Sequence, residues 1–491
     1  MSPITEKDKT PISNERYRLH YHLMPPAGWM NDPNGVSYYN GEYHVFYQHY
    51  PYAPFQGAMH WGHAKSRDLV HWEHLPVALA PSESYDKGGE GASGCWSGSA
   101  VDDQGTFVLV YTGHVDGNSP EEVQCIAFSS DGIVFEKLPE NPVIPGPPDE
   151  ECFGFRDPKV WKRGDTWYLV VGYGKDGLGK ALLYSSSDLR SWHYHGPAAE
   201  SDGTMGDMWE CPDLFPLGRA EDDHVLIFSP MNMGITKTFY WTGKFDYTGL
   251  KFDLRHAERV DYGFDFYAPQ TMVDARGRRI MYAWMNIWGA DMPEREDGWM
   301  GSFTLPRELK LAEDGTLRFI PVEELKSLRG EHHSYTNVVI PEHGTLALPY
   351  LEGDSLEISA VIDVSGQADG TFGIRLRCSD DGAEYTEISY SHGEGKLQMD
   401  RNRAGAGNGG ISEVELAPME DGRVRLHLFL DTSSVELFMN EGRKTMTNRI
   451  YPASSSLGIH LFAQGAVSLE SLDVWKLALH PAAKSGAISE K

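Results

Sequence analysis

Three short acidic motifs in this chain of 491 residues place carboxylates where they could act on a substrate. Residues 29–35 read WMNDPNG, residues 155–158 read FRDP, and residues 209–213 read WECPD. Each motif sets an acid (Asp32, Asp157 or Glu210) close to a proline, which is typical of a turn. An acid in such a turn can simply cap it, and this is the alternative for each motif taken singly. Two carboxylates in one pocket can instead supply the nucleophile and the proton donor that glycosidic bond cleavage requires.

Taken together, the three motifs resemble the three-carboxylate site of glycoside hydrolase family 32, which includes invertases, sucrose-6-phosphate hydrolases, inulinases and levanases. The resemblance extends over nearly the whole chain, because residues 434–438 (SVELF) and 447–452 (TNRIYP) are similar to the family's C-terminal β-sandwich. It implies that Asp32 is the nucleophile, that Glu210 is the general acid/base, and that Asp157 binds two fructosyl hydroxyls.

The same resemblance implies a set of substrate-binding residues around the three acids. Arg156 is expected to keep Asp157 ionised and to reach the sugar. The others are amides, a hydroxyl and aromatic rings that bind or enclose the fructosyl unit: Asn31, Gln48, Trp61, Trp96, Ser97, Tyr267 and Trp288. For each aromatic ring, packing inside the fold is the alternative. Many family members carry a Trp where this chain has Gln56, so we expect sucrose-sized substrates rather than long fructans.

A repeat in the sequence explains how acids so far apart could meet. Five segments share one layout, a small or acidic opening, a strand, a polar turn and a second strand, and they open at residues 32, 97, 157, 213 and 270. A second element, Ser-x-Asp or Ser-Asp, recurs between them at residues 68, 131 and 188. Short strands at this period predict five blades of a β-propeller, against the alternative of a β-rich domain with chance spacing. Equivalent blade openings converge on the central channel, so the three acids are predicted to face one pocket.

The pattern changes near residue 320. Residues 321–335 are predicted to form a linker with a short helix that begins at Pro321. From residue 336 to 491, apolar residues alternate with polar ones, as in Leu356, Ile358 and Ala360, which predicts a β-sandwich. The predicted fold class is therefore all-β, with a five-bladed propeller over residues 1–320 followed by this sandwich. The sandwich holds no cluster of acids and is expected to support the propeller.

Composition narrows the class of partner. The formal net charge is −28, and an acidic surface disfavours nucleic acids and anionic membranes. No apolar run approaches the ~20 residues of a membrane span, and residues 1–18 lack the apolar segment of a signal peptide. Five irregularly spaced cysteines indicate neither a zinc site nor a disulfide framework. We therefore expect a cytoplasmic enzyme with no metal and no cofactor, whose partner is a small sugar; homo-oligomer formation is left open.

The predicted function is that of a retaining β-fructofuranosidase. Its expected substrates are the terminal β-D-fructofuranosides of sucrose, sucrose-6-phosphate or short fructooligosaccharides. A fructosyltransferase or an exo-acting inulinase or levanase would use the same site. A non-catalytic sugar-binding propeller is the alternative of a different class, and the presence of all three acids argues against it.

Overall fold

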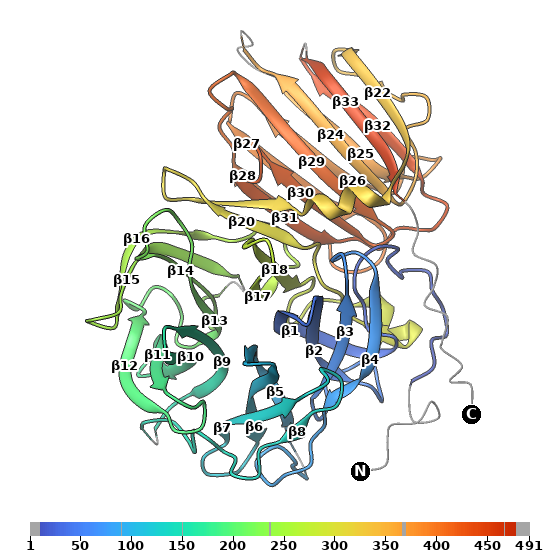
Figure 1. The fold of residues 1–491 in the computed structure, drawn as a ribbon. Helices are drawn as coiled ribbons and strands as arrows, with labels where there is room; N and C mark the ends of the chain where they lie inside the picture. The colour runs from blue at the N-terminus through green and yellow to red at the C-terminus, as the bar shows by residue number, and fades with distance from the viewer. Residues whose placement is uncertain are drawn as a thin grey trace.

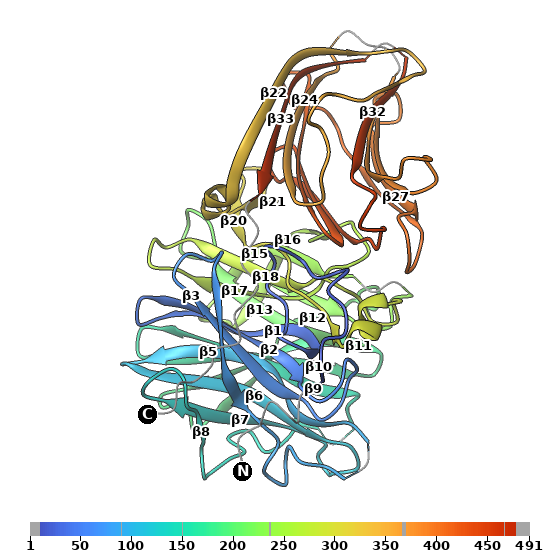
Figure 2. The ribbon, with the colours of Figure 1, turned by 90° about the vertical axis from the view of Figure 1, so that its right-hand side faces the viewer.

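The computed structural model describes residues 10–89, 91–149, 151–234, 237–365, 370–465 and 467–477. Nearly all regular structure in these ranges is β-strand, and helix is confined there to two short 3₁₀ helices, η2 (Pro293–Asp297) and η3 (Glu323–Leu328). The strands form two bodies, a ring of sheets and a two-layered unit that stands on one side of it (Figures 1 and 2). In the same ranges, no helix is long and apolar enough to cross a membrane.

The ring is a propeller of five blades, as predicted, and each blade is an antiparallel sheet whose strands follow the chain order. Blade 1 contains β1 (Gly28–Tyr39), β2 (Glu42–Tyr50), β3 (His60–Ser66) and β4 (Trp72–Leu79). Blade 2 contains β5 (Ser93–Asp103), β6 (Thr106–Val115), β7 (Glu122–Ser129) and β8 (Glu136–Lys137). Blade 3 contains β9 (Gly154–Arg163), β10 (Thr166–Lys175), β11 (Leu178–Ser186) and β12 (His193–Glu200). Blade 4 contains β13 (Trp209–Pro216), β14 (Asp223–Pro230), β15 (Phe239–Asp246) and β16 (Lys251–Arg259). Blade 5 contains β17 (Tyr267–Val273), β18 (Arg279–Trp284), β20 (Arg307–Leu311) and β21 (Leu317–Pro321).

The innermost strands β1, β5, β9, β13 and β17 surround the centre of the ring (Figure 1). Each contacts the next, and β17 contacts β1, so the ring is closed. A short strand from the end of the propeller, β19 (Trp299–Met300), pairs in parallel with the start of β1 and ties the last blade to the first. A ring of this kind leaves only short, protected sheet edges around its centre.

Each inner strand carries a break in register at the same place, close to its start. The breaks fall between Met30 and Pro33, between Trp96 and Gly98, opposite Val170 and Gly172, between Glu210 and Asp213, and between Tyr267 and Gln270. Asp157, Cys211 and Ala268 have positive φ angles of 69°, 47° and 49° at equivalent positions of three blades. A β-bulge bends its strand and turns a side chain away from the regular face. The prolines and acids that stood out in the sequence therefore mark bulges, and the bulges turn their side chains toward the channel.

The second repeated element of the sequence forms a turn between the third and fourth strands of three blades. The Asp68 carboxylate accepts hydrogen bonds from the backbone N–H groups of Val70 and His71. Asp131 and Asp188 make the same pair of bonds to the residues two and three positions later. These aspartates shape outer turns and lie outside the chemistry.

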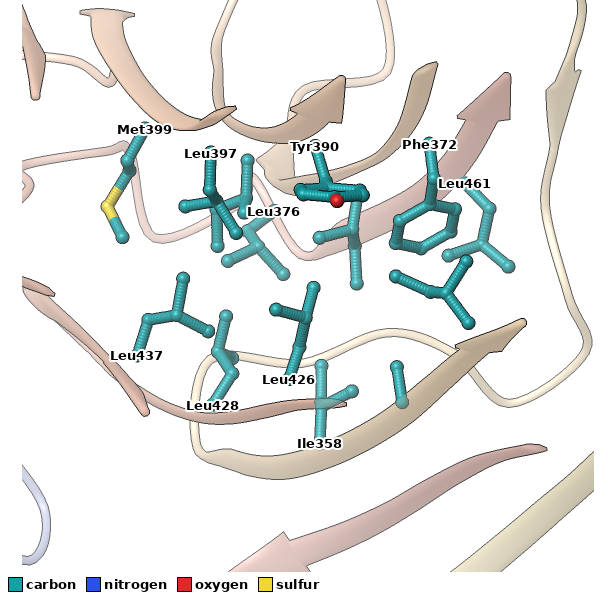
Figure 3. Packing of buried hydrophobic residues seen from close by; sticks show 14 of the residues in the cluster. Ile358, Phe372, Leu376, Tyr390, Leu397, Met399, Leu426, Leu428, Leu437 and Leu461 are labelled. Carbon is teal, nitrogen blue, oxygen red and sulfur yellow. The ribbon is translucent and has the colours of Figure 1, made fainter. Parts of the chain in front are cut away.

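The C-terminal unit is a β-sandwich of two six-stranded sheets, as predicted. One sheet contains, in spatial order, β22 (Arg329–Ile340), β33 (Val467–Leu477), β24 (Leu356–Asp363), β29 (Arg423–Asp431), β30 (Ser434–Met439) and β31 (Lys444–Arg449). The other contains β23 (Thr345–Leu346), β32 (Gly458–Gln464), β25 (Thr371–Cys378), β26 (Tyr385–Ser391), β27 (Lys396–Arg403) and β28 (Ile411–Glu415). Figure 3 shows the core between them, in which Leu426 and Leu428 face Leu376, Leu397 and their neighbours across the gap.

The two domains follow one another closely in sequence and share a buried boundary. Strand β21 ends at Pro321, η3 follows at once, and β22 begins at Arg329. Phe429 and Phe438 of the sandwich belong to the same apolar cluster as Phe303 and Leu305 of the propeller. The domain limits given above for the sequence stay a prediction.

Candidate active site

A cavity of about 270 Å³ opens where the starts of the inner strands meet. All three predicted acids line it, one each from blades 1, 3 and 4, together with amide, aromatic and methionine side chains. The full lining consists of Asn31, Asp32, Gln48, Gln56, Met59, Trp96, Ser97, Arg156, Asp157, Glu210, Met231 and Trp288. Acids about 180 residues apart thus share one pocket because each lies in or next to a bulge of an inner strand.

Two of the predicted binding residues hold the Asp32 carboxylate. Ser97 Oγ donates a hydrogen bond to Asp32 Oδ2 at 2.8 Å, and Asn31 Nδ2 donates to Oδ1 at 3.1 Å. The Cys211 thiol lies 3.7 Å from Oδ2. Burial and the negative charge of Glu210 raise the pKa of Asp32 to about 6, although these three hydrogen bonds act in the opposite direction. Asp32 is therefore a fixed carboxylate that ionises close to neutral pH.

Both oxygens of Glu210 are held by hydrogen bonds. Oε1 accepts from Arg156 Nε at 3.1 Å and from Arg156 Nη2 at 2.9 Å. Oε2 accepts from the Tyr267 hydroxyl at 2.5 Å. The side chain keeps 17 % of its surface exposed, toward the pocket. The guanidinium of Arg156 thus hydrogen-bonds Glu210, while its charge lowers the pKa of Asp157, the residue that the sequence led us to expect it to keep ionised.

Asp157 lies deeper than Glu210 and is held by the backbone of the adjoining blade. Its Oδ2 accepts a hydrogen bond from the N–H of Cys211 at 2.9 Å, and its own N–H donates to Thr112 Oγ1 at 3.0 Å. Burial raises the pKa of Asp157, and the charges of Glu210 and Asp32 raise it further, against the opposing effect of Arg156. Asp157 therefore shares the pocket with carboxylates whose negative charges oppose its ionisation.

The predicted aromatic residues separate into two kinds. Trp96 and Trp288 line the cavity; Trp96 stacks on His114 with ring centroids 3.6 Å apart, and Trp288 stacks on Trp29 at 5.9 Å. Trp61 is fully buried, and its Nε1 donates to the Trp96 carbonyl at 3.1 Å. Trp61 therefore supports the pocket wall from behind instead of forming it.

The remaining predicted residues, Gln48 and Tyr267, differ in how they reach the pocket. Gln48 lines the cavity, and its Nε2 donates to the Cys95 carbonyl at 2.9 Å. Tyr267 is 2 % exposed, and it contributes to the site through its hydroxyl, which donates a hydrogen bond to Glu210.

Sequence reasoning missed several residues of the site. Met59 and Met231 line the cavity, and Gln56, noted only as a missing aromatic, lines it as well. Methionines carry no polar signal by which a sequence could reveal them. Glu122, whose carboxylate bonds Arg156 Nη1 at 3.0 Å, reads in the sequence as an ordinary acid that follows a polar turn and begins β7. Its contact crosses between blades, so only the fold reveals it.

Comparison with known proteins identifies the family of this chain. Residues 22–321 match the glycosyl hydrolases family 32 N-terminal domain, and residues 324–476 match the glycosyl hydrolases family 32 C-terminal domain. The chain belongs to glycoside hydrolase family 32. It is 40 % identical to a sucrose-6-phosphate hydrolase of Zymomonas mobilis, over 95 % of this chain and 93 % of the other. It is also 40 % identical to a raffinose invertase of Escherichia coli, over 93 % of this chain and 94 % of the other.

A solved structure agrees with these sequence relatives. The fold matches that of a Bombyx mori GH32 beta-fructofuranosidase mutant in complex with sucrose, with a TM-score of 0.79 and 36 % identity over 96 % of this chain and 95 % of the other. The family 32 chain described here is thus a glycoside hydrolase, and the family resemblance found in the sequence is confirmed.

The arrangement of charges in this family 32 site suits acid/base chemistry. Three carboxylates and one guanidinium face the same pocket, so negative charge is in excess and the cluster tends to hold a proton. A proton shared in this way is available for a leaving group, and hydrogen bonds from Ser97 and Asn31 hold the Asp32 carboxylate in place.

Proposed function

We propose that this family 32 enzyme is a retaining β-fructofuranosidase with Asp32 as nucleophile and Glu210 as general acid/base. It hydrolyses the terminal β-D-fructofuranoside of sucrose, sucrose-6-phosphate or short fructooligosaccharides. One observation carries the proposal: a carboxylate held by two neutral donors and a carboxyl held by Arg156 and Tyr267 share one small pocket.

The reaction proceeds in two displacements. Asp32 attacks the anomeric carbon of the fructosyl unit while Glu210 gives its proton to the leaving glycosidic oxygen, and a fructosyl–Asp32 ester forms. Glu210, now anionic, takes a proton from water as the water oxygen attacks the anomeric carbon, which releases fructose and frees the Asp32 carboxylate. The two steps each invert the anomeric carbon, so the configuration is retained overall.

Asp157 is proposed to bind two hydroxyls of the fructosyl ring. Its raised pKa leaves the carboxyl able to donate as well as accept a hydrogen bond. Such bonds can strengthen as the ring approaches the oxocarbenium-like transition state. Trp96 and Trp288 form the apolar walls beside it.

The size of the cavity supports a short substrate. Its volume of about 270 Å³ lies just below the usual range of ligand pockets, which suits a single sugar unit. Gln56 occupies the wall where an aromatic ring would stack on a further sugar. We expect kcat/KM to be highest for sucrose-sized substrates and lower for inulin and levan.

Product analysis tests the proposed function. Purified protein is incubated with sucrose, sucrose-6-phosphate, raffinose, inulin and levan, and released fructose is measured. With methanol added, the expected product is methyl β-D-fructofuranoside, the anomer of the starting configuration. No fructose from any of these sugars would refute a fructosidase, and methyl α-D-fructofuranoside alone would refute retention by way of Asp32.

Location, domain limits and assembly are further parts of the proposal. All five cysteines are unpaired, which fits the reducing cytoplasm. The propeller is proposed to end near residue 320, and the sandwich to stabilise it, so that a chain ending near Arg329 exposes apolar surface and aggregates. Sedimentation of the truncated chain measures this aggregation, and sedimentation of the full chain detects any homo-oligomer. A truncated chain that is monodisperse and fully active would contradict the supporting role of the sandwich.

A further inference from the structure

Glu122 is a buried acid that does not line the pocket but contacts a residue that does. The two partners of this contact, Glu122 and Arg156, have side chains only 9 % and 10 % exposed. Glu122 Oε1 accepts a hydrogen bond from Arg156 Nη1 at 3.0 Å, and Oε2 accepts one from the N–H of Phe155. His114 Nδ1 lies 3.4 Å from Oε1. A buried acid with this many donors is anionic at neutral pH. Burial raises the pKa of Glu122, but Arg156, His114 and the Phe155 N–H lower it by more, so the net shift is downward.

The Arg156 guanidinium is shared between two carboxylates on opposite sides. Nη1 points to Glu122, whereas Nε and Nη2 both bond Glu210 Oε1. One positive charge therefore faces two acids, and the second of them has to carry a proton in the first step of the reaction. An unshared guanidinium in this position would favour the anionic form of its partner.

We propose that Glu122 is a positioning residue for the acid/base: it fixes Arg156 against Glu210 and neutralises the guanidinium charge, so that Glu210 keeps its proton at working pH. The proposal rests on the proposed function, since it assigns a supporting role around the same acid. Glu122 acts only through Arg156 and is not itself a catalytic residue.

Several other charged and titratable groups surround Glu210 and Glu122. Those that face Glu210 come from four blades: Arg156, Asp157, Asp32, Tyr267 and Cys211. Those that face Glu122 are Arg156, His114 and Cys152. His114 is in turn bonded to the half-exposed Asp116 at 2.8 Å. Of these groups, only Glu122 is a carboxylate bonded to Arg156 on the side away from the pocket.

The sign of the expected pH effect follows from this charge balance. Removing the negative charge of Glu122 leaves the Arg156 charge to act on Glu210 alone, and the anionic form of Glu210 becomes easier to reach. Glu210 then loses its proton at lower pH, and the alkaline limb of the kcat/KM profile moves to lower pH. An opposite charge at hydrogen-bond distance commonly produces a shift of about one pH unit or more.

The experiment compares kcat/KM for sucrose across pH in the full chain and three variants. Glu122→Gln removes the charge but keeps the shape, and its alkaline limb is expected about one unit lower, with kcat/KM on that limb reduced by up to about 10-fold. Glu122→Asp keeps the charge, so its limb stays near that of the wild type even if the rate falls. Glu136→Gln, at an exposed acid on the outer strand β8 of the same blade, is the matched control, and its rate and profile should be unchanged. A Glu122→Gln limb that coincides with the wild-type limb would overturn the proposal.

A second measurement decides the matter even if Glu122→Gln fails to fold. A p-nitrophenyl leaving group needs little protonation, so a misplaced acid slows p-nitrophenyl β-D-fructofuranoside far less than sucrose. In Glu122→Asp, whose shorter side chain displaces Arg156, the rate ratio of aryl fructoside to sucrose should rise several-fold. An unchanged ratio with both rates lowered equally would overturn the positioning role. Wild-type protein without fructosidase activity would instead refute the proposed function.

Discussion

Two groups of buried carboxylates in the described part of the chain differ in the amount of positive charge around them. The first lies at the boundary between the domains, where Arg307 bonds Asp261 at 3.0 Å and Glu436 at 2.6 Å. His22 bonds Asp431 at 2.7 Å and Glu436 at 3.0 Å. Although burial raises the pKa of Asp431 and Glu436, their partners outweigh it and the net shift is downward. Burial lowers the pKa of His22, but its two acids raise it to about 9.

The second cluster is the candidate active site, where Arg156 faces Glu122, Glu210 and Asp157, and Asp157 in turn faces Asp32. Here burial and mutual repulsion raise the pKa of Asp32 to about 6 and also raise that of Asp157. Both clusters are buried and rich in acids, so burial alone does not separate them. The difference is compensation: paired acids stabilise the domain boundary, whereas under-paired acids exchange protons near neutral pH.

The largest expected effect is the loss of activity when the under-paired cluster is broken. Asp32→Asn and Glu210→Gln should each lower kcat/KM for sucrose by about 10⁴-fold or more, because each removes one of two groups that act together. Circular dichroism and thermal melting serve as the folding control. Asp32→Asn is expected to melt no lower than the wild type at pH 7, because it removes a buried charge. Near wild-type rates in either folded variant would refute its assigned role.

Breaking the compensated cluster should affect stability instead. Arg307→Ala leaves Asp261 and Glu436 without their shared partner, and loss of one side of a buried ion pair costs about 3–5 kcal/mol of unfolding free energy. Urea unfolding measures this loss, and Arg443→Ala, at an exposed ion pair with Asp314, is the matched control, expected to change stability by less than about 1 kcal/mol. Equal effects of the two substitutions would show that the boundary cluster carries no special weight.

The pH dependence of stability should show a contribution from His22. Because its folded pKa is raised from 6.5 to about 9, its stabilising effect is fully present below about pH 6.5 and is lost as the pH rises through about 9. The shift corresponds to about 3 kcal/mol. Unfolding free energies at pH 6 and pH 9.5 are compared between the wild type and His22→Gln. The difference between the two proteins should shrink with rising pH; a difference that is constant would contradict a charged His22.

The smallest expected effect is a shift of the acid limb of activity. Asp32 must be ionised to attack, so kcat/KM should fall as the pH drops below about 6, with a limb that belongs to the coupled cluster. Ser97→Ala removes a hydrogen bond that favours the anion and should move this limb upward by less than about one pH unit. Profiles of kcat/KM against pH measure both. A downward shift in Ser97→Ala would show that the hydroxyl does not stabilise the Asp32 carboxylate.

Much of the fold could be predicted from the sequence because its turns carry strong local signals. Five openings at regular intervals, three of them with proline-flanked acids, marked the bulged starts of the inner strands, and alternation of apolar residues marked the sandwich. The count of five blades followed from that spacing alone.

The details of the site depend on contacts between blades and were less accessible. Arg156 stands next to Asp157 in sequence, yet its guanidinium bonds Glu210 and Glu122 of other blades. Trp61 and Trp96 look equivalent as aromatic residues, but packing against Phe46 and Tyr111 buries the first, whereas the second lines the cavity. No local sequence pattern shows which of these side chains reaches the pocket. Successive residues of a strand point to opposite faces of the sheet, and a bulge changes the face to which the residues after it point.

The most direct test of the central claim traps the covalent intermediate. Glu210→Gln is mixed with p-nitrophenyl β-D-fructofuranoside, whose leaving group departs without protonation, while the missing base leaves the second step slow. Mass spectrometry of the digested protein should then find one fructosyl residue on the peptide that contains Asp32, and azide should release it as β-fructosyl azide. Release of nitrophenol with no adduct, or an adduct on the peptide that contains Asp157, would contradict the assignment of Asp32 as the nucleophile.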